Sequence, residues 1–373
     1  MDTYLDHNAT TPVRPEAAEA VSRALALRGN ASSVHRFGRL VRHVIDEARE
    51  GVAALVGAAP ANIIFTSGGT EANNLALAHH DGVVLVSAVE HDSVRGVRAD
   101  ADVIPVDSNG IVCCETLDRR LGEAEGSALV SVMLANNETG VLQPIRDVVA
   151  VARTHGAMVH CDGVQAAGKV ALSFDDLGVD LLSVSAHKLG GPQGGGALTV
   201  RNGLDLEPLL RGGGQERRRR AGTENVSGIA GFGAAARIAQ ADIAAFDRFG
   251  TLRDDMEKRL RAEGADVTVY GGEVARLPST SCLGLPDMRA EIQVMQLDLA
   301  GVAVSAGSAC SSGKVASSHV LRAMGCDEEA AHSAIRVSLG WTTEPSDLDR
   351  FVDALTAMVQ RRDCNDKNRR SVA

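Results

Sequence analysis

Apolar and polar positions follow two different periods along this chain, and the alternation between them predicts its elements. Short apolar runs bounded by polar residues or glycine are typical of strands, and apolar residues recurring every three to four positions are typical of helices. The predicted strands are 63–66, 83–88, 103–106, 128–134, 158–162, 181–185 and 196–200, and later 280–285, 302–305 and 335–339. The predicted helices include 15–27, 38–56, 145–155, 225–244, 246–263, 289–299 and a last one from Ser346. Alternating strands and helices indicate an α/β fold with a largely parallel, doubly wound sheet.

Two long predicted helices, 225–244 and 246–263, separate this region from a second, smaller one. A chain of 373 residues is too long for one small core, which favours two domains. We expect a large domain over residues 15–250 and a small α+β domain built from residues 1–14 and 251–362. Residues 363–373 are expected to form a disordered tail.

The composition is that of a soluble globular enzyme, with 45% hydrophobic and 23% charged residues. The net charge of −10 argues against a general nucleic-acid binder. No apolar run is long enough to cross a bilayer, and the first residues lack the pattern of a signal peptide. The seven cysteines are scattered without a CxxC pair, which favours reduced thiols over disulfides or a zinc site. We therefore expect a cytoplasmic protein with no membrane partner and no direct nucleic-acid binding.

Two charged side chains end two of the predicted buried strands. Lys188 follows the strand 181–185, and Asp162 closes the strand 158–162. Ligands of α/β sheets bind beyond the carboxyl ends of the strands, so the amine and the carboxylate point to one place. Pyridoxal phosphate (PLP) requires such a pair, a lysine for its Schiff base and an acid for its pyridinium nitrogen. A structural Lys–Asp ion pair is the alternative.

A second group of residues suits the phosphate of the same cofactor. Gly69 and Thr70 precede a predicted helix, where backbone N–H groups, a hydroxyl and the helix N-terminus favour an anion. An ordinary turn is the alternative for this Gly-Gly pair. Ser185 and His187 flank Lys188 closely enough to donate to the same phosphate.

Further polar residues at strand ends suit the ring of the cofactor. His91 follows the strand 83–88, where an imidazole can stack on a ring and move protons. Asn137 lies in the segment after the strand 128–134, and Gln165 lies three residues past Asp162. Either amide could hydrogen-bond a ring hydroxyl or cap its own loop. Their repeated placement at strand ends favours the cofactor role.

Cys310 and Arg336 suit the substrate. Cys310 lies in a run of small residues, 305–313, after a predicted strand, where a thiolate could act as a nucleophile. An incidental cysteine in a turn is the alternative. Arg336 is a charge among apolar residues of the strand 335–339, which suits a bidentate clamp on a carboxylate. A structural ion pair competes with that role.

A metal site is the weakest hypothesis. His160 and Cys161 precede Asp162 directly and could imitate a ligand cluster. Adjacent residues of a strand point to opposite faces, so the three side chains do not converge easily. We expect no metal.

Nine segments together resemble one family. In chain order they are LDHNATTP (5–12), SGGTEANN (67–74), EH (90–91), NNETG (136–140), DGVQ (162–165), SAHK (185–188), RAGT (220–223), GSAC (307–310) and SAIR (333–336). This set is similar to the NifS/IscS-like cysteine desulfurases, class V aminotransferase-fold PLP enzymes. The resemblance runs from about Tyr4 to Ala357. It implies a fold-type I PLP-dependent transferase with a mainly parallel sheet of the seven-stranded type, a smaller C-terminal α+β domain, and a homodimer with active sites at the subunit interface.

The resemblance also implies a role for each matching residue. Lys188 would hold PLP, Asp162 would pair with its ring nitrogen, and His91 would stack on the ring as acid and base. The remaining implied PLP-binding residues are Gly69, Thr70, Asn137, Gln165, Ser185, His187 and, from the other subunit, Thr223. The implied substrate-binding residues are Arg336, Asn8 and Asn137. Cys310 would attack the sulfur of the substrate.

The implied reaction removes sulfur from L-cysteine, giving L-alanine and a persulfide on Cys310. The sulfur would pass to an acceptor protein for iron–sulfur cluster assembly, thiolation of tRNA or a cofactor, or DNA phosphorothioation. Three features depart from the family. Gln215 stands where a histidine is common, residues 217–220 are all arginine, and the chain ends soon after its last predicted helix, which favours a specialised acceptor.

Two other functions remain open. A selenocysteine lyase or another class V PLP enzyme would share the fold, although an aminotransferase has no use for a nucleophile at Cys310. A degenerate homologue acting as a binding scaffold is of another class. The presence of Lys188, Asp162, His91 and Cys310 argues against the scaffold.

Overall fold

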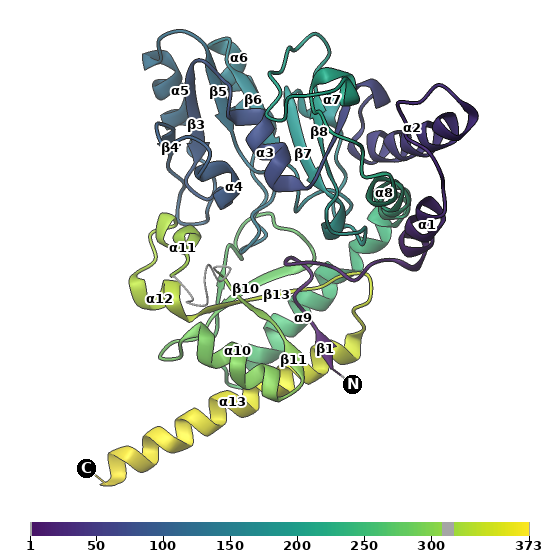
Figure 1. The fold of residues 1–373 in the computed structure, drawn as a ribbon. Helices are drawn as coiled ribbons and strands as arrows, with labels where there is room; N and C mark the ends of the chain where they lie inside the picture. Colours follow the sequence, from purple (N-terminus) through teal and green to yellow (C-terminus); the bar gives the residue numbers. More distant parts are fainter. Residues whose placement is uncertain (1, 308–316, 373) are drawn as a thin grey trace.

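The structure of the protein is a computed structural model that describes residues 2–307 and 317–372 (Figure 1). A large sheet with helices on both faces forms the upper part of the view, and a smaller sheet with its helices lies below it. A small strand near the N-terminus lies in the lower part, so the two ends of the chain contribute to the same region.

The large sheet has seven strands in the order β2-β8-β7-β6-β5-β3-β4. Their bounds are β2 Ile63–Thr66, β3 Val83–Ser87, β4 Asp102–Ile104, β5 Ala128–Ser131, β6 Met158–Asp162, β7 Leu181–Ser185 and β8 Gly196–Val200. The five strands from β4 to β7 pair in parallel, whereas β8 and β2 pair antiparallel at one edge. The prediction of a mainly parallel, seven-stranded sheet is confirmed.

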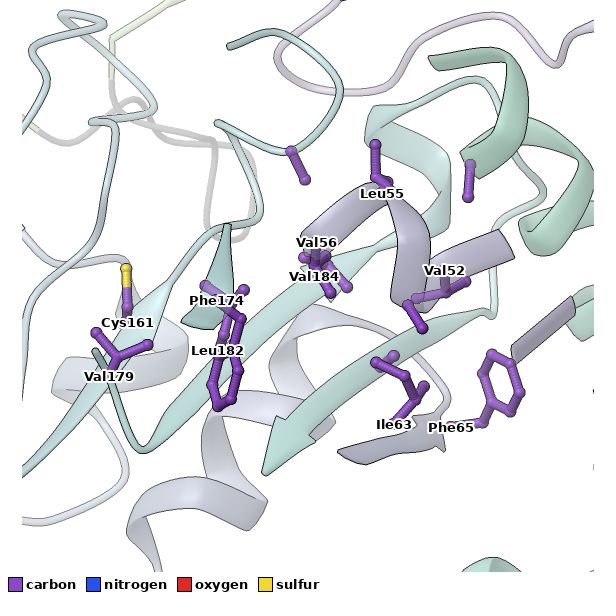
Figure 2. Close-up of a cluster of buried hydrophobic side chains, with 14 of the residues drawn as sticks. Val52, Leu55, Val56, Ile63, Phe65, Cys161, Phe174, Val179, Leu182 and Val184 are labelled. Atoms are coloured by element: carbon purple, nitrogen blue, oxygen red, sulfur yellow. The ribbon is translucent and has the colours of Figure 1, made fainter. Parts of the chain in front are cut away.

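Helices cover both faces of this sheet because its strands are apolar on both faces. The helices of this part are α1 Pro15–Leu25, α2 Arg36–Val56, α3 Gly69–Leu77, α4 Asp92–Arg95, α5 Cys114–Glu123, α6 Ile145–Thr154, α7 Phe174–Leu177 and α8 Val226–Phe246, with short 3-10 turns η1 Pro60–Asn62, η2 Ala186–Lys188 and η3 Gln215–Arg218. Ile63 and Phe65 pack in one core with α2, whereas Ile64 between them packs in another core with α3. Figure 2 shows Val52 and Val56 of α2 above the strands of the sheet. Alternate residues of a strand therefore enter cores on opposite faces of the sheet.

The second part is built on a four-stranded antiparallel sheet, in the order β12-β13-β10-β9. Its strands are β9 Thr268–Tyr270, β10 Thr280–Gly284, β12 Ser305–Ala306 and β13 Ala334–Ser338, and a parallel pair joins β1 Thr3–Tyr4 to β11 Val302–Ala303. Its helices are α9 Arg248–Ala262, α10 Ala290–Leu299, α11 His319–Ala323, α12 Glu328–Ser333 and α13 Pro345–Val372. Leu5 is fully buried in the core of this part with Phe249 and Phe351. The N-terminal segment is therefore anchored in this second part.

Two segments differ from the sequence-based expectation. Cys114 is the first residue of α5 and Cys113 its N-cap, in a stretch where the sequence analysis names no helix. The last helix continues to Val372 through most of the segment expected to be disordered, because no proline or glycine interrupts it after Pro345. None of the helices in the described ranges carries an apolar stretch sufficient to span a bilayer.

Candidate functional site

The carboxyl ends of the parallel strands surround a cavity of about 200 Å³ that opens to solvent. The residues predicted from sequence that line it are Gly69, Thr70, His91, Asn137, Asp162, Gln165, Ser185, His187 and Lys188. The structure therefore brings together side chains from five separate segments of the chain.

Lys188 ends the 3-10 turn that follows β7. Its Nζ donates to the backbone carbonyl of Asn8 at 2.5 Å and to that of Ala9 at 2.8 Å. Burial lowers the pKa of Lys188 to about 8, and the positive charge of Arg336 adds to this effect. An amine with this pKa is partly neutral near neutral pH, as a nucleophile or base must be.

Asp162 ends β6 and is 6% exposed. Its Oδ2 accepts a hydrogen bond of 2.8 Å from Asn73 Nδ2, and its Oδ1 accepts one of 2.9 Å from the amide of Val164. Sequence reasoning missed Asn73, although it lies three residues after Thr70, on the same side of α3. Asn73 and Val164 fix the carboxylate at the floor of the cavity.

The predicted phosphate end lies where α3 begins at Gly69. The backbone of Gly68, just before α3, lies close to that of Gly196 in β8. Position 196 therefore requires glycine, because a Cβ there would lie 2.5 Å from the carbonyl carbon of Gly68. His187 lies beside this end, and burial lowers its pKa to about 4, so its ring is neutral at neutral pH. The neutral imidazole, with Nδ1 3.3 Å from the hydroxyl of Thr10, can donate one N–H to an anion.

The predicted ring end carries His91, Asn137 and Gln165. His91 is the N-cap of α4, and its Nδ1 accepts from the amide of Ser93 at 3.1 Å. Gln165 is engaged on both sides of its amide, donating to the carbonyl of Asn8 at 3.0 Å and accepting from Lys169 at 2.8 Å. Sequence reasoning did not single out Lys169, since one lysine in a turn carries no local signal.

Three side-chain oxygens on this cavity fit a polar ligand. Asn73 Oδ1, Asn137 Oδ1 and Ser185 Oγ are buried and have no hydrogen-bond partner among the residues that the structure describes. Leaving such groups unpaired costs about 1–3 kcal/mol each, unless a bound molecule completes them. Ser185 lies at the predicted phosphate end, and Asn137 at the predicted ring end. With the amine of Lys188 and the carboxylate of Asp162 between them, the residues present fit PLP.

Three predicted residues in the described ranges do not line the cavity. Arg336 lies beside it, with Nη1 donating to the carbonyl of Asn137 at 3.0 Å and Nη2 to Asp6 at 2.7 Å. Asn8 lies between Lys188 and Asn137, hydrogen-bonded to both through its backbone and side chain. Thr223 is exposed on this single chain. Cys310 lies outside the described residues.

The arginine run 217–220 is part of the framework near the phosphate end. Glu216, which precedes it, is buried and forms two hydrogen bonds to Arg49, of 2.7 and 2.8 Å. Arg220 pairs with Glu71 at 2.9 Å, and Glu71 also accepts from the amide of Ser67. The loop therefore supports the segment before α3 rather than being solvated throughout.

His160 is fully buried within the large sheet. Its ring nitrogens pair with the hydroxyls of Ser131 at 2.8 Å and Ser183 at 2.9 Å. Burial lowers its pKa to about 3, so it stays neutral. The two serines account for both ring nitrogens.

The fold and the cavity define a member of the class-V aminotransferase family, whose profile matches residues 3–351. The cysteine desulfurase IscS of Dictyoglomus turgidum is 40% identical, covering 96% of this chain and 95% of its own. A NifS-like protein from Rickettsia africae ESF-5 has a structure with a TM-score of 0.91 at 35% identity, covering 96% of this chain and all of its own. A structure of SspA in complex with cysteine has a TM-score of 0.77 at 29% identity, covering 90% of this chain and 98% of its own. Within that family the chain belongs to the NifS/IscS-like cysteine desulfurases, and the resemblance read from its motifs is confirmed.

Proposed function

We propose that this chain is a PLP-dependent cysteine desulfurase, which takes sulfur from L-cysteine and holds it as a persulfide on Cys310. The observation that carries the proposal is that Lys188 and Asp162 line one cavity together with buried side-chain oxygens that have no hydrogen-bond partner in the described residues. The cysteine desulfurases among its relatives support it, as does the relative whose structure holds cysteine.

Each end of the cavity would bind one part of the cofactor. Lys188 would bind it covalently, and Asp162 would face its ring nitrogen. Gly69, Thr70, Ser185 and His187 would hold its phosphate, and His91, Asn137 and Gln165 would contact its ring. PLP, when bound, supplies an electron sink that stabilises negative charge developing at the substrate Cα.

The residues around the cavity would then bind and orient the substrate. Arg336 has a buried Nε without a partner among the described residues, which leaves an N–H for a carboxylate. Asn137 and Asn8 adjoin it and would complete the carboxylate site. Lys188, as a free amine, would remove the Cα proton, because its lowered pKa favours the neutral form.

The sulfur step balances without an added oxidant. The thiolate of Cys310 attacks the substrate sulfur, so an S–S bond forms while the C–S bond breaks. The substrate carbon is reduced and gains protons to give L-alanine, and the two sulfurs share the oxidation as a persulfide. An acceptor protein with its own thiol would take the outer sulfur by a similar exchange.

The assembly and the location follow from the same proposal. Thr223 is exposed and does not line the cavity of its own chain, which suits a homodimer in which it reaches the phosphate of the other subunit. We propose the cytoplasm as the location, because the thiolate of Cys310 must stay reduced between turnovers.

The experiment follows alanine and the mass of the Cys310 peptide after the purified yellow protein is mixed with L-cysteine. We expect alanine together with one added sulfur on that peptide. Cys310→Ser should lose turnover by about 1000-fold while keeping its colour, and Cys113→Ser, a partly exposed cysteine elsewhere, should match the wild type. Alanine formation without the mass shift, or full activity of Cys310→Ser, contradicts the proposal.

A further inference from the structure

Lys169 is a buried lysine behind the site, 4% exposed. In the described ranges no carboxylate lies within ion-pair distance of its Nζ, and the nearest charges acting on it are those of Lys188 and Arg336, both positive. Burial and these two cations lower its pKa well below the ordinary value. A buried amine in a positive environment is unfavourable for folding, which suggests that it serves the site.

The contacts of Lys169 go to two amide side chains of the site. Its Nζ donates to Asn8 Oδ1 at 2.8 Å and to Gln165 Oε1 at 2.8 Å. An amine has two hydrogens even when neutral, so it can donate to both oxygens in either protonation state. Each amide is therefore turned with its oxygen toward Lys169 and its NH₂ group away from it.

The orientation of these amides decides what the site offers to a ligand. Gln165 Nε2 donates to the backbone carbonyl of Asn8 at 3.0 Å, which leaves its second N–H for the cavity that Gln165 lines. Asn8 Nδ2 donates to Thr280 at 3.0 Å and to the carbonyl of Asn137 at 3.3 Å, beside Arg336. The same carbonyl of Asn8 accepts from Lys188. Lys169, Gln165, Asn8 and Lys188 thus form one connected network.

We propose that Lys169 is a positioning residue that fixes the amides of Asn8 and Gln165, so that Gln165 turns an N–H toward an anionic group of the cofactor and Asn8 holds Asn137, beside Arg336, in place for an anionic group of the substrate. The inference rests on the proposed function, because the ring oxygen of PLP and the carboxylate of cysteine are those anions. Without Lys169 the amide of Gln165 can rotate by half a turn and present its oxygen, which repels an anion. The amide of Asn8 can likewise turn its oxygen toward the carbonyl of Asn137 and displace it. Lys169 itself does not line the cavity, so it would touch neither ligand.

The test compares Lys169→Met in the PLP-loaded enzyme with the wild type. We expect the pH midpoint of the cofactor's visible absorbance to rise by at least about half a unit, since a donor to its ring oxygen is lost. The KM for L-cysteine should rise about tenfold with kcat within about threefold, as expected for one lost hydrogen bond in binding. Lys258→Met, an exposed lysine on α9, is the matched control and should change neither quantity.

Two further variants keep the test decisive if Lys169→Met folds poorly. Lys169→Arg retains donors and should restore the wild-type midpoint, whereas Lys169→Gln can present either end of its amide and should shift the midpoint as Met does. Variants of Lys169 with an unchanged midpoint and KM, whatever their melting temperature, overturn the positioning role alone. A wild-type protein that forms neither a visible band nor alanine overturns the proposed function and this inference together.

Discussion

The buried carboxylate of Glu138 accepts a hydrogen bond of 2.5 Å from the hydroxyl of Ser318, 180 residues later in the chain. Ser318 is also the N-cap of α11, accepting from the amide of Leu321 at 3.0 Å. A Cβ on Gly307 would lie 2.8 Å from Glu138 Oε2, so this carboxylate lies against Gly307 and Ser318, which precede and follow the stretch that includes Cys310. Since Glu138 directly follows Asn137, it links Gly307 and Ser318 to the predicted substrate site.

Removing the carboxylate should separate sulfur transfer from cofactor binding. We expect Glu138→Ala to slow persulfide formation on Cys310 by about tenfold, because one buried hydrogen bond no longer positions Ser318. Glu138→Gln keeps an acceptor oxygen and should lose at most about threefold. The visible absorbance of bound PLP should be the same in both. The measurement is a rapid-quench time course of the Cys310 peptide mass.

Gly307→Ala provides an independent check of the same contact. As the single substitution, its methyl group is expected to crowd Glu138 and slow persulfide formation on Cys310. Combined with Glu138→Ala, which opens space beside residue 307, it should slow persulfide formation little further. Glu329→Ala, on the exposed side of α12, should leave the rate unchanged. Additive effects of the two substitutions would show that Gly307 and Glu138 act separately.

The lowered pKa of Lys188 predicts the pH dependence of proton removal. An amine accepts a proton only when neutral, so below its pKa of about 8 the rate should rise about tenfold per pH unit, and above it the rate should level off. A lysine of ordinary pKa would continue rising to beyond pH 10. Exchange of the Cα hydrogen of L-alanine with deuterated solvent measures this step without the thiol titration of cysteine. A rate that still rises between pH 9 and 10 would contradict the assignment.

The sequence predicted well those parts of the site that depend on strand ends. Strands β6 and β7 occur at the predicted residues, and parallel pairing of Asp162 with Ser183 places their ends together. Lys188 and Asp162 follow from that geometry, since one edge of a parallel sheet collects the ends of all its strands. The local period of apolar residues is sufficient to establish this much.

Contacts between distant segments could not be read from local patterns. The N-terminal segment reaches Lys188 and Lys169 because β1 pairs with β11, a pairing across about 300 residues that no local period encodes. α5 was missed because two cysteines at its start resemble neither a polar cap nor an apolar stripe. The predicted role of Thr223 requires a second chain, which one sequence does not position.

Glu90 should make stability fall as pH rises. It is fully buried, and burial raises its pKa to about 8, although Ser87 Oγ at 2.6 Å and the amide of Met133 at 2.7 Å donate to it. Between the unfolded pKa near 4.5 and about 8 the folded state holds a proton that the unfolded state has released. The contribution of Glu90 to the free energy of unfolding is therefore fully present below pH 4.5 and is lost as pH rises through 8. The loss is at most about 1.4 kcal/mol per pH unit.

Glu90→Gln should remove that slope. A neutral amide keeps an acceptor for Ser87 and Met133 but has no proton to lose, so its unfolding midpoint should vary less between pH 5.5 and 8 than that of the wild type. Urea unfolding of the PLP-loaded protein at both pH values measures the difference. Equal slopes for the two proteins would mean that Glu90 is ionised in the folded state.

The buried ion pair of Arg49 and Glu216 should be the main contact that stabilises the loop containing the arginine run 217–220, near the predicted phosphate end. Both side chains are less than 9% exposed, and Glu216 Oε2 also accepts from the amide of Phe65 at 3.1 Å. Arg217 and Arg218, which follow directly, have positive φ angles of 56° and 69°, a backbone conformation that arginine rarely adopts without outside support. Arg49→Met should therefore destabilise the protein by about 3–5 kcal/mol, because it leaves the Glu216 charge buried without its partner.

Loss of Arg49 should also weaken PLP binding at the predicted phosphate end. The same loop contains Arg220, which pairs with Glu71, and Glu71 accepts a hydrogen bond from the amide of Ser67. We expect faster release of PLP from Arg49→Met than from the wild type, followed by the decay of visible absorbance on dilution. Arg119→Met breaks the exposed pair with Glu123 on α5 and should shift stability by no more than about 0.5 kcal/mol, with PLP release unchanged. If Arg49→Met loses stability but releases PLP at the wild-type rate, the loop supports the fold without supporting the phosphate end.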